Sequence, residues 1–367
     1  MDPRSFNEVK PILGGTSPRL PLESLENRMA GSVRRPPLSV IMSVYNNGAH
    51  LDQAIWSVRQ QSFGAFELLI MDDGSTDESA AIISRHAVDD SRIIAAHQPN
   101  RGLVAALNRM LAKASAPLIA RMDGDDVAHP ARFARQMAYM KAKPETIVLG
   151  TQIRLIDYDG APLPKKVFRP LAHDAIVASF GKSASFAHNS VIYQAAAVRA
   201  VGGYRAAFRH CEDLDLWLRL APRGQFANLP DYLVDYRIYP GQVSQRHLVE
   251  QTINATIAIL FNNYIGRGAP DPLGGLAHMP DITELESVTR IPGLAASIRA
   301  RVAQSILWSP DALANDGLPL LLDYIAETPL SDLKMAALSR AAARLGRAGH
   351  WGAAQQLAAA LFNKWRA

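Results

Sequence analysis

The chain has 367 residues, of which 48% are hydrophobic and 20% charged, a composition that excludes a largely disordered or membrane-spanning protein. Its formal net charge of +5 suits an anionic substrate or an acidic lipid surface. Its basic residues are not interleaved with aromatic residues in the pattern of RNA-binding modules, so we expect no nucleic-acid partner.

The single cysteine, Cys211, excludes an intrachain disulfide and a cysteine-based zinc cluster and favours a reducing compartment. The first residues lack the charged-then-apolar order of a signal peptide, and no apolar stretch is long enough to span a bilayer. We therefore expect a cytoplasmic protein, with any membrane contact peripheral and at the inner face.

Residues 1–36 are rich in Pro, Gly, Ser and Arg and predict a flexible N-terminal arm. Apolar runs then alternate with helical patterns, and each run ends in a polar loop. The predicted strands cover residues 38–44, 66–71, 93–96 and 118–122. This alternation predicts an α/β fold with a Rossmann-like, mostly parallel sheet flanked by helices, whose ligands bind at the carboxyl ends of the strands.

Near residue 245 the sequence changes to Ala-, Leu- and Arg-rich helical segments. We therefore predict a sheet-based domain over residues 37–245 and a C-terminal α-helical region over residues 246–367. Apolar residues between 248 and 264 share one helix face. With the basic residues of the last helices, this face is compatible either with packing against the rest of the protein or with a peripheral membrane surface.

Two adjacent aspartates, Asp72 and Asp73, follow a predicted buried strand and precede a Gly-Ser pair. An ordinary turn explains the glycine but not two carboxylates leaving a buried strand. A carboxylate at that position can accept a hydrogen bond from the imide N–H of a uracil or from a ribose hydroxyl.

A second acidic cluster, Asp-Gly-Asp-Asp at residues 123–126, follows the fourth predicted strand. The carboxylates of Asp123 and Asp125 can share one divalent ion, and hard oxygen ligands select Mg²⁺ or Mn²⁺. The intervening Gly124 lets the backbone approach a ligand. The alternative is a solvated acidic turn before a helix.

A third cluster, Glu212 and Asp213, opens an amphipathic helix. Carboxylates at a helix N-terminus are favoured by the helix dipole, which is a purely structural explanation. The functional alternative is a general base, which needs a carboxylate within hydrogen-bond reach of an acceptor hydroxyl.

Residues 38 to about 245 resemble the family 2 glycosyltransferases, inverting enzymes of the A-type nucleotide-diphosphosugar transferase fold. The segments that carry the resemblance occur in the family's order: residues 39–46, Gln-Gln-Ser-Phe at 60–63, residues 66–77, Asn-Arg-Gly at 100–102, Asp-Gly-Asp-Asp at 123–126, His-Asn-Ser-Val at 188–191, Gly-Gly-Tyr at 202–204 and Glu-Asp-Leu at 212–214. The resemblance implies transfer of a sugar from a nucleotide-diphosphate donor, with UDP as the default, to a hydroxyl of a glycan or lipid-linked acceptor. It further implies Mn²⁺ or Mg²⁺ and a role in cell-surface polysaccharide synthesis.

The resemblance also implies roles for individual residues. It assigns the donor nucleotide to Ser43, Tyr45, Asp73, Asn108 and Asp123, the metal to Asp125 with Asp123, catalysis to Asp213 as base beside Glu212, and, more weakly, the acceptor or diphosphate to His188, Arg237 and Gln242. One departure stands out: many relatives carry histidine where this chain has Tyr239.

Other nucleotide-binding classes do not fit. No Gly-x-Gly-x-x-Gly follows a predicted strand, and no Gly-x-x-x-x-Gly-Lys-Ser/Thr supports a P-loop. The remaining alternative is a catalytically inert sugar-nucleotide-binding or scaffold module that acts through its helical tail.

Overall fold

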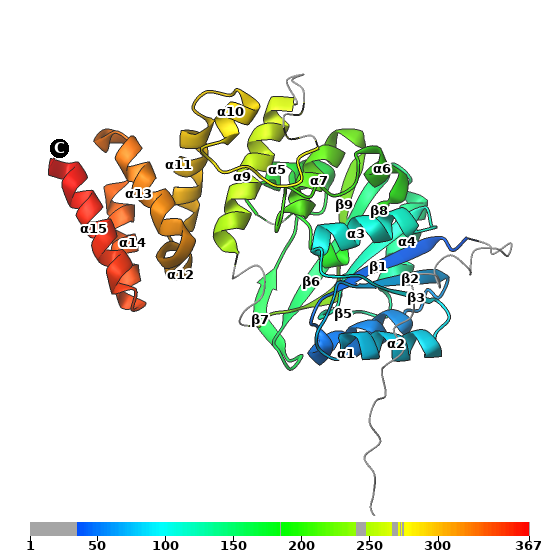
Figure 1. Cartoon of the computed structure of the whole chain (residues 1–367). Coiled ribbons are helices and arrows are strands. Elements are labelled where there is room, and N and C mark those ends of the chain that lie inside the picture. The colour runs from blue at the N-terminus through cyan, green and yellow to red at the C-terminus, as the bar shows by residue number, and fades with distance from the viewer. Residues whose placement is uncertain are drawn as a thin grey trace, which may run out of the picture.

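The structure is a computed structural model that describes residues 35–183, 185–239, 247–265, 271, 273 and 275–366. The predicted N-terminal arm, apart from its last two residues, lies outside them. A twisted sheet with helices on both faces occupies the first part of the chain, and an array of helices extends from it to the C-terminus (Figure 1). The predicted α/β fold class with a helical C-terminal region is confirmed.

Four parallel strands form the first half of the sheet, in the order β3-β2-β1-β4. They are β1 (Leu38–Val44), β2 (Phe66–Asp72), β3 (Ile93–His97) and β4 (Leu118–Asp123). Helices α1 (Gly48–Arg59), α2 (Ser79–Asp89) and α3 (Leu103–Lys113) connect them in turn. This half is parallel because each helical crossover returns the chain to the same end of the sheet.

The second half of the sheet is mixed. It contains β5 (Val127–Ala128), β6 (Thr146–Ile156), β7 (Pro162–Val167), β8 (Ile192–Gln194) and β9 (Gln225–Arg237). Strand β8 pairs antiparallel with both β4 and β6, whereas β6 and β9 pair in parallel. Strand β7 folds back on β6 as a hairpin, and β5 pairs antiparallel with β9. Parallel pairing is therefore confined to the first four strands and to β6 with β9.

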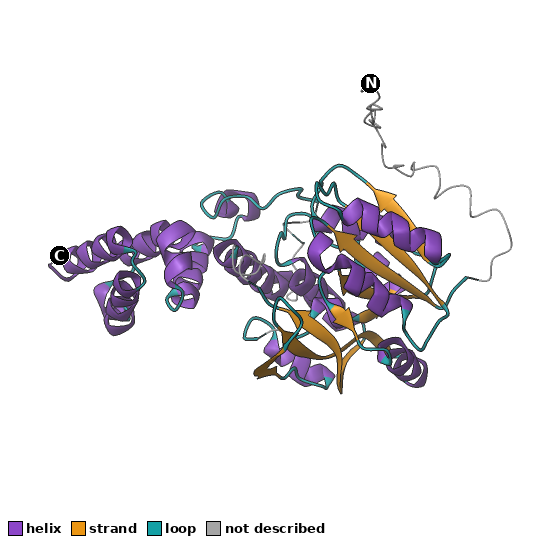
Figure 2. Ribbon diagram, turned by 90° about the horizontal axis from the view of Figure 1, so that it is seen from below, coloured by secondary structure: helices purple, strands orange, loops and turns teal. Residues whose placement is uncertain are grey.

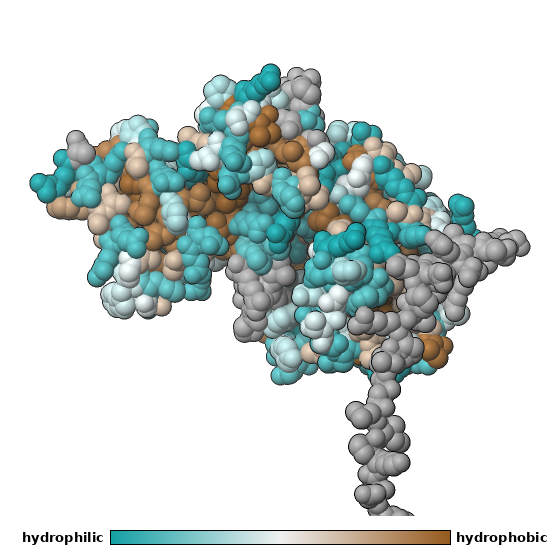
Figure 3. Space-filling view, viewed as in Figure 1, coloured by the Kyte–Doolittle hydropathy of each residue, from teal (hydrophilic) through white to brown (hydrophobic). Residues whose placement is uncertain are grey.

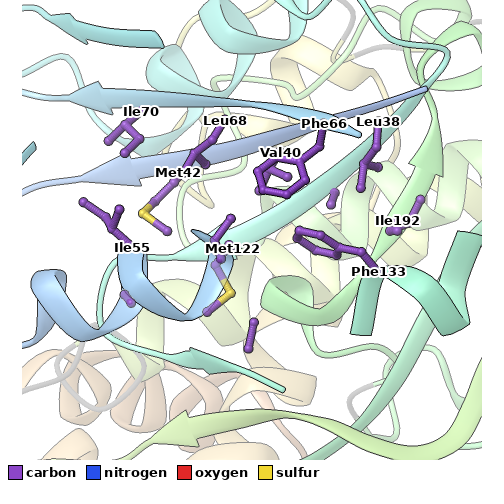
Figure 4. Packing of buried hydrophobic residues seen from close by; sticks show 14 of the residues in the cluster. Leu38, Val40, Met42, Ile55, Phe66, Leu68, Ile70, Met122, Phe133 and Ile192 are labelled. Atoms are coloured by element: carbon purple, nitrogen blue, oxygen red, sulfur yellow. The ribbon is translucent and has the colours of Figure 1, made fainter. Parts of the chain in front are cut away.

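The sheet buries side chains on both faces, as the near-continuous apolar strands predict. Met42 and Val40 of β1 point to one face, where Ile55 of α1 and Phe133 of α4 (Arg132–Ala142) cover them (Figure 4). Ile41, between them in sequence, belongs to the cluster on the opposite face. The alternation follows the two-residue period of a strand.

The opposite face carries α3 and several shorter helices. These are α5 (His173–Ser179), η2 (His188–Ser190), α6 (Ala195–Ala200), α7 (Glu212–Leu220) and η3 (Ala221–Arg223). Trp217 of α7 is buried against Phe186, with ring centroids 5.3 Å apart. This packing sets the position of α7, whose first turn holds Glu212 and Asp213.

The C-terminal helices form their own apolar core, and they extend away from the sheet (Figure 2). They are α9 (Leu248–Ile265), α10 (Leu285–Thr289), α11 (Leu294–Ile306), α12 (Pro310–Ala312), η4 (Leu313–Gly317), α13 (Leu318–Glu327), η5 (Leu330–Asp332), α14 (Met335–Arg347) and α15 (Trp351–Arg366). Ile257 and Phe261 of α9 are fully buried in this core together with Phe208 and Leu218 from the sheet-based part. The apolar face of α9 is therefore used for internal packing.

Candidate functional site

The acidic loops of the first half of the sheet meet at one edge. Ser43 lies opposite Met71 on one side and Asp123 on the other, and Val44 lies opposite Asp72. Because these strands are parallel, their carboxyl ends fall at the same edge, where α/β proteins bind ligands. The structure thus brings Ser43 close to two of the acidic clusters.

The loop after β1 is tied to the loop after β2. Asn46 has a left-handed backbone with φ of 53°, and its amide N–H donates to Ser75 Oγ at 2.9 Å. Its side-chain oxygen accepts from the Thr76 N–H at 2.8 Å. These two bonds hold the neighbouring Tyr45 in place, and the Tyr45 side chain remains 50% exposed. Its ring is therefore free to stack against a planar ligand such as a nucleobase.

Asp73 is buried beneath that edge and holds the loop that precedes α3. Its carboxylate accepts from Gln98 Nε2 at 2.6 Å and from the N–H groups of Arg101 and Gly102 at 2.9 and 2.8 Å. An ionised carboxylate has about four acceptor positions. Asp73 therefore fixes the β3–α3 loop and keeps about one position for a ligand.

The cluster after β4 brings carboxylate oxygens of Asp123, Asp125 and Asp126 within 4.8 Å of one another. Asp126 is buried and is bound by Asn189 and by the Arg237 N–H. Its burial and the neighbouring carboxylates raise its pKa well above the ordinary value, and burial also raises the pKa of Asp123. Such a cluster of hard oxygen donors fits a divalent cation, because the cation would relieve the repulsion.

The glycine in this cluster has a different role from the expected one. A Cβ atom on Gly124 would lie 3.2 Å from Asn47 Oδ1 and 3.3 Å from Leu51 Cδ1. The lack of a side chain therefore lets the β4 loop pack against the β1–α1 loop. The space over Gly124 is filled by the protein and not by a ligand.

Tyr239 contacts the acidic cluster directly. Its hydroxyl donates a hydrogen bond to Asp125 Oδ2 at 2.9 Å. Burial and the charge of Asp125 raise the pKa of the Tyr239 hydroxyl, so it stays protonated and remains a donor. The tyrosine thus orients Asp125 through a hydrogen bond.

Arg237 does not extend toward the site's surface. Its side chain is buried, and its guanidinium donates to the Asp125, Asp157 and Tyr158 carbonyls and to Gln53 Oε1. These bonds join two loops and helix α1 around the acidic cluster. Arg237 therefore holds together the segments that surround the site. A direct contact with a diphosphate would require breaking some of these hydrogen bonds. Gln242 lies outside the described residues.

Glu212 and Asp213 lie in the first turn of α7, and Glu212 is more deeply buried than Asp213. Glu212 is 6% exposed, and its burial and the charge of Asp213 raise its pKa to about 8. Burial raises the pKa of Asp213 as well, but nearby Arg121 and Arg169 favour its charged form. At neutral pH Glu212 therefore keeps its proton, and the more exposed Asp213 is the carboxyl of the pair whose charged form the two arginines favour.

His188 is a buried neighbour of this pair. Its Nε2 lies 2.9 Å from the Tyr204 hydroxyl, and its Nδ1 lies 3.7 Å from Glu212 Oε1. Burial and the charge of Arg121 lower the pKa of His188 well below its ordinary value. Both His188 and Glu212 are thus neutral at pH 7, and their contact is not an ion pair. His188 therefore contacts Glu212 inside the protein as a neutral neighbour.

Asn108 makes bonds that are purely internal. Its Nδ2 donates to the Tyr204 carbonyl at 2.7 Å, and its Oδ1 accepts from the Tyr204 N–H at 2.9 Å. This two-way bond joins α3 to the segment before α7. Asn108 therefore positions that segment through one donor and one acceptor position of its amide.

Arg121 is a residue of the site that sequence reasoning missed. It lies within β4, forms an ion pair with Asp123, and has a side chain that is only 6% exposed. Its charge opposes the rise in the pKa of Asp213 that burial causes, and together with burial it lowers the pKa of His188. Arg121 therefore connects the cluster at 123–126 electrostatically with the pair at 212–213. An arginine inside an otherwise apolar strand was the signal that could have revealed it.

The chain is similar to known glycosyltransferases. The sequence model of Glycosyl transferase family 2 matches residues 39–194. The amylovoran biosynthesis glycosyltransferase AmsE of Erwinia amylovora is 33% identical over 212 residues, covering 57% of this chain and 79% of AmsE. The O-antigen biosynthesis glycosyltransferase WbnJ of Escherichia coli is 32% identical over 206 residues, covering 55% of this chain and 80% of WbnJ.

Among solved structures, residues 1–349 of TarS from S. aureus in complex with UDP-GlcNAc share the fold. The TM-score is 0.52 at 16% identity, and the likeness covers 90% of this chain and 89% of the other. The fold, the matched family model and the two relatives, each covered over more than two thirds of its length, agree. The chain belongs to glycosyl transferase family 2 and is a glycosyltransferase.

Proposed function

We propose that the protein transfers a sugar, with inversion, from a nucleoside-diphosphate donor to a hydroxyl group of a glycan or lipid-linked acceptor. The observation that carries this proposal is that Arg121 interacts electrostatically with two acidic sites. One is the carboxylate cluster at 123–126, which suits a cation, and the other is the partly exposed carboxylate of Asp213. A sugar transfer needs both: one group for the leaving diphosphate and one for the attacking hydroxyl.

The donor would bind at the edge formed by the loops after β1, β2 and β4. Tyr45 offers an exposed ring for the base, Ser43 a hydroxyl, and Asp73 the remaining acceptor position of its carboxylate. UDP is the default nucleotide by family resemblance. The TarS structure that shares the fold is a complex with UDP-GlcNAc. These residues would orient the donor so that its diphosphate points toward the cluster at 123–126.

Asp123 and Asp125 would hold a divalent cation, Mn²⁺ or Mg²⁺. When bound there, such a cation neutralises charge on the leaving diphosphate. The hydroxyl of Tyr239 keeps Asp125 oriented, and the charge of Arg121 opposes the rise in the pKa of Asp123 that burial causes. Asp126 is bound inside the protein and would support the other two from behind.

Asp213 would be the general base. Its carboxylate accepts the proton of the acceptor hydroxyl while the hydroxyl oxygen forms a bond to the anomeric carbon. The bond from that carbon to the diphosphate oxygen breaks at the same time, and its electron pair leaves with the nucleoside diphosphate. One displacement from the opposite face inverts the anomeric configuration. Protonated Glu212 cannot take the acceptor's proton and would position Asp213.

A donor panel tests the proposal. Purified protein would be incubated with UDP-, GDP- and dTDP-sugars and Mn²⁺ or Mg²⁺, with release of nucleoside diphosphate measured and the product's anomeric configuration read by NMR. We expect release from one donor class and an inverted product. A retained configuration, or release that is unchanged in Asp213→Asn, would contradict the proposed mechanism.

The cellular process we propose is synthesis of a bacterial surface polysaccharide. The two relatives, AmsE and WbnJ, carry names of biosynthetic enzymes for amylovoran and O-antigen. We further propose that residues 37–245 form the catalytic domain and residues 246–367 a helical domain docked on it through α9.

We also propose that the helical domain makes a peripheral contact with anionic membranes. In the part of the chain that the structure describes, no helix is both long and apolar enough to cross a bilayer. Figure 3 shows apolar side chains gathered over the C-terminal helices. Phe362 and Trp365 of α15 are 54% and 68% exposed and lie beside Lys364 and Arg366. Aromatic and basic residues together suit the interface of an anionic membrane.

A further inference from the structure

Two histidines and a glutamate meet at the junction between the two parts of the chain. His210 lies just before α7, His247 just before α9, and Glu250 in the first turn of α9. The imidazole rings are stacked, with centroids 4.1 Å apart and planes 15° apart. None of the three belongs to the site at residues 123–126, and no part of the proposed transfer reaction uses them.

The donor atoms of this cluster have the spacing of metal ligands. Glu250 Oε2 lies 3.6 Å from His210 Nε2 and 3.7 Å from His247 Nδ1, and all three ligand atoms lie within 4.8 Å of one another. Two ligands of a tetrahedral zinc ion, each about 2.0–2.1 Å from the metal, are about 3.4 Å apart. Rotation of the two imidazoles out of their stacked arrangement would place all three donors around one ion.

The surroundings leave these donor atoms available. His210 Nε2 is buried and has no hydrogen-bond partner among the described residues. The two carboxylate oxygens of Glu250 face different groups. Oε1 lies 4.0 Å from Arg209 Nε, and Oε2 faces the two imidazoles. Asn254 of α9 donates to the Arg209 carbonyl at 2.8 Å, so the loop that carries His210 is already attached to the helix that carries Glu250. This bond fixes the position of that loop relative to α9.

We propose that His210, His247 and Glu250 form a second metal site, for Zn²⁺ or a similar transition-metal ion, separate from the carboxylate cluster. Two imidazoles and one carboxylate favour zinc over Mg²⁺, which prefers oxygen ligands alone. The bound ion joins α9 to the segment that leads into Glu212 and Asp213. Its occupancy stabilises the docking of the helical region on the catalytic part of the chain.

Metal titration of the full, untagged chain tests this site. Zn²⁺ binding would be measured by calorimetry, Co²⁺ binding by its visible absorption, and the melting temperature with and without Zn²⁺. The variants are His247→Ala and Glu250→Gln, because both residues lie at the partly exposed start of α9 and their loss leaves the buried core intact. His278→Ala, at an exposed histidine outside the cluster, is the matched control.

We expect Zn²⁺ to raise the melting temperature of the wild type and of the control, because a ligand that binds the native state stabilises it. His247→Ala and Glu250→Gln should each weaken Zn²⁺ binding at least about tenfold. Asp125→Ala, which removes a ligand of the other site, should keep the zinc-induced shift. Loss of the shift in Asp125→Ala together with its retention in His247→Ala would place the zinc at the carboxylate cluster and overturn the proposal.

Discussion

Arg121 and Asp123 form an ion pair at the carboxyl end of β4, two residues apart in a strand whose other side chains are largely apolar. Alternate residues of a strand point to the same face, so this spacing places the guanidinium beside the carboxylate. Asp123 belongs to the cluster at 123–126, and the charge of Arg121 also favours the charged form of Asp213. The ion pair determines how much negative charge this buried region can hold.

Replacing Arg121 with Met should destabilise the fold by about 3–5 kcal/mol, the usual cost of breaking a buried ion pair on one side. Asp123 and the nearby carboxylates would lose their compensating charge. Urea unfolding measures the change. Arg85→Met is the matched control, because its pair with Asp52 is exposed, and it should cost no more than about 1 kcal/mol. Equal effects of the two substitutions would contradict the buried role of Arg121.

Replacing Asp125 with Ala should reduce nucleotide release by about a hundredfold or more, because a metal that stabilises the leaving group contributes several kcal/mol. Metal-dependent tightening of nucleotide binding should disappear as well. Asp159→Ala, an exposed aspartate in the β6–β7 turn, should behave as wild type. Full turnover in excess EDTA would show that the reaction does not need a divalent ion.

Replacing Asp213 with Asn should lower the turnover number about 10²–10⁴-fold, the usual contribution of a general base. Nucleotide affinity should change little, since Asp213 acts on the acceptor. Steady-state kinetics and nucleotide titration separate the two effects. If binding and rate fell equally, Asp213 would have a structural role at the start of α7.

Glu212 should make the protein less stable as the pH rises. Its pKa is about 8 in the folded protein against an ordinary value of 4.5, so it keeps its proton when folded and loses it when unfolded across that interval. Its contribution to stability is complete below pH 4.5 and is lost as the pH approaches 8. Glu212→Gln should therefore show a smaller drop in melting temperature between pH 5 and pH 8 than the wild type.

The control for this pH experiment is Glu145→Gln, which removes an exposed carboxyl just before β6 without changing the buried pair. Melting curves at several pH values in buffers of equal ionic strength provide the comparison. A wild-type slope in Glu212→Gln would mean that Glu212 is ionised in the folded protein at neutral pH.

Replacing Phe362 and Trp365 together with Ala should weaken binding to anionic vesicles, because the aromatic side chains supply the apolar part of the contact. Flotation with phosphatidylserine-containing liposomes at low and high salt measures it, and high salt should weaken binding of the wild type. Trp56→Ala, at an exposed tryptophan of α1, is the control. Absence of wild-type flotation at low salt would leave α15 as a packing or assembly element.

Local features of the chain were sufficient to predict much of the fold. Alternating apolar runs and helical patterns predicted the first four strands and the three helices between them, because strand and helix periods are visible in neighbouring residues. The acidic clusters at 72–73, 123–126 and 212–213 were equally local, and the structure places the first two beside Ser43 at the carboxyl ends of the parallel strands.

Only the tertiary structure showed which polar side chains form hydrogen bonds inside the protein. Arg237 bonds to Gln53, which lies 184 residues away in sequence, and Asn108 bonds to Tyr204, 96 residues away. It also brought His210 to His247 and placed Arg121 near both acidic sites. The role of a buried polar residue depends on its hydrogen-bond partners. Those partners come from segments that are far apart in the sequence, so local sequence patterns do not predict them.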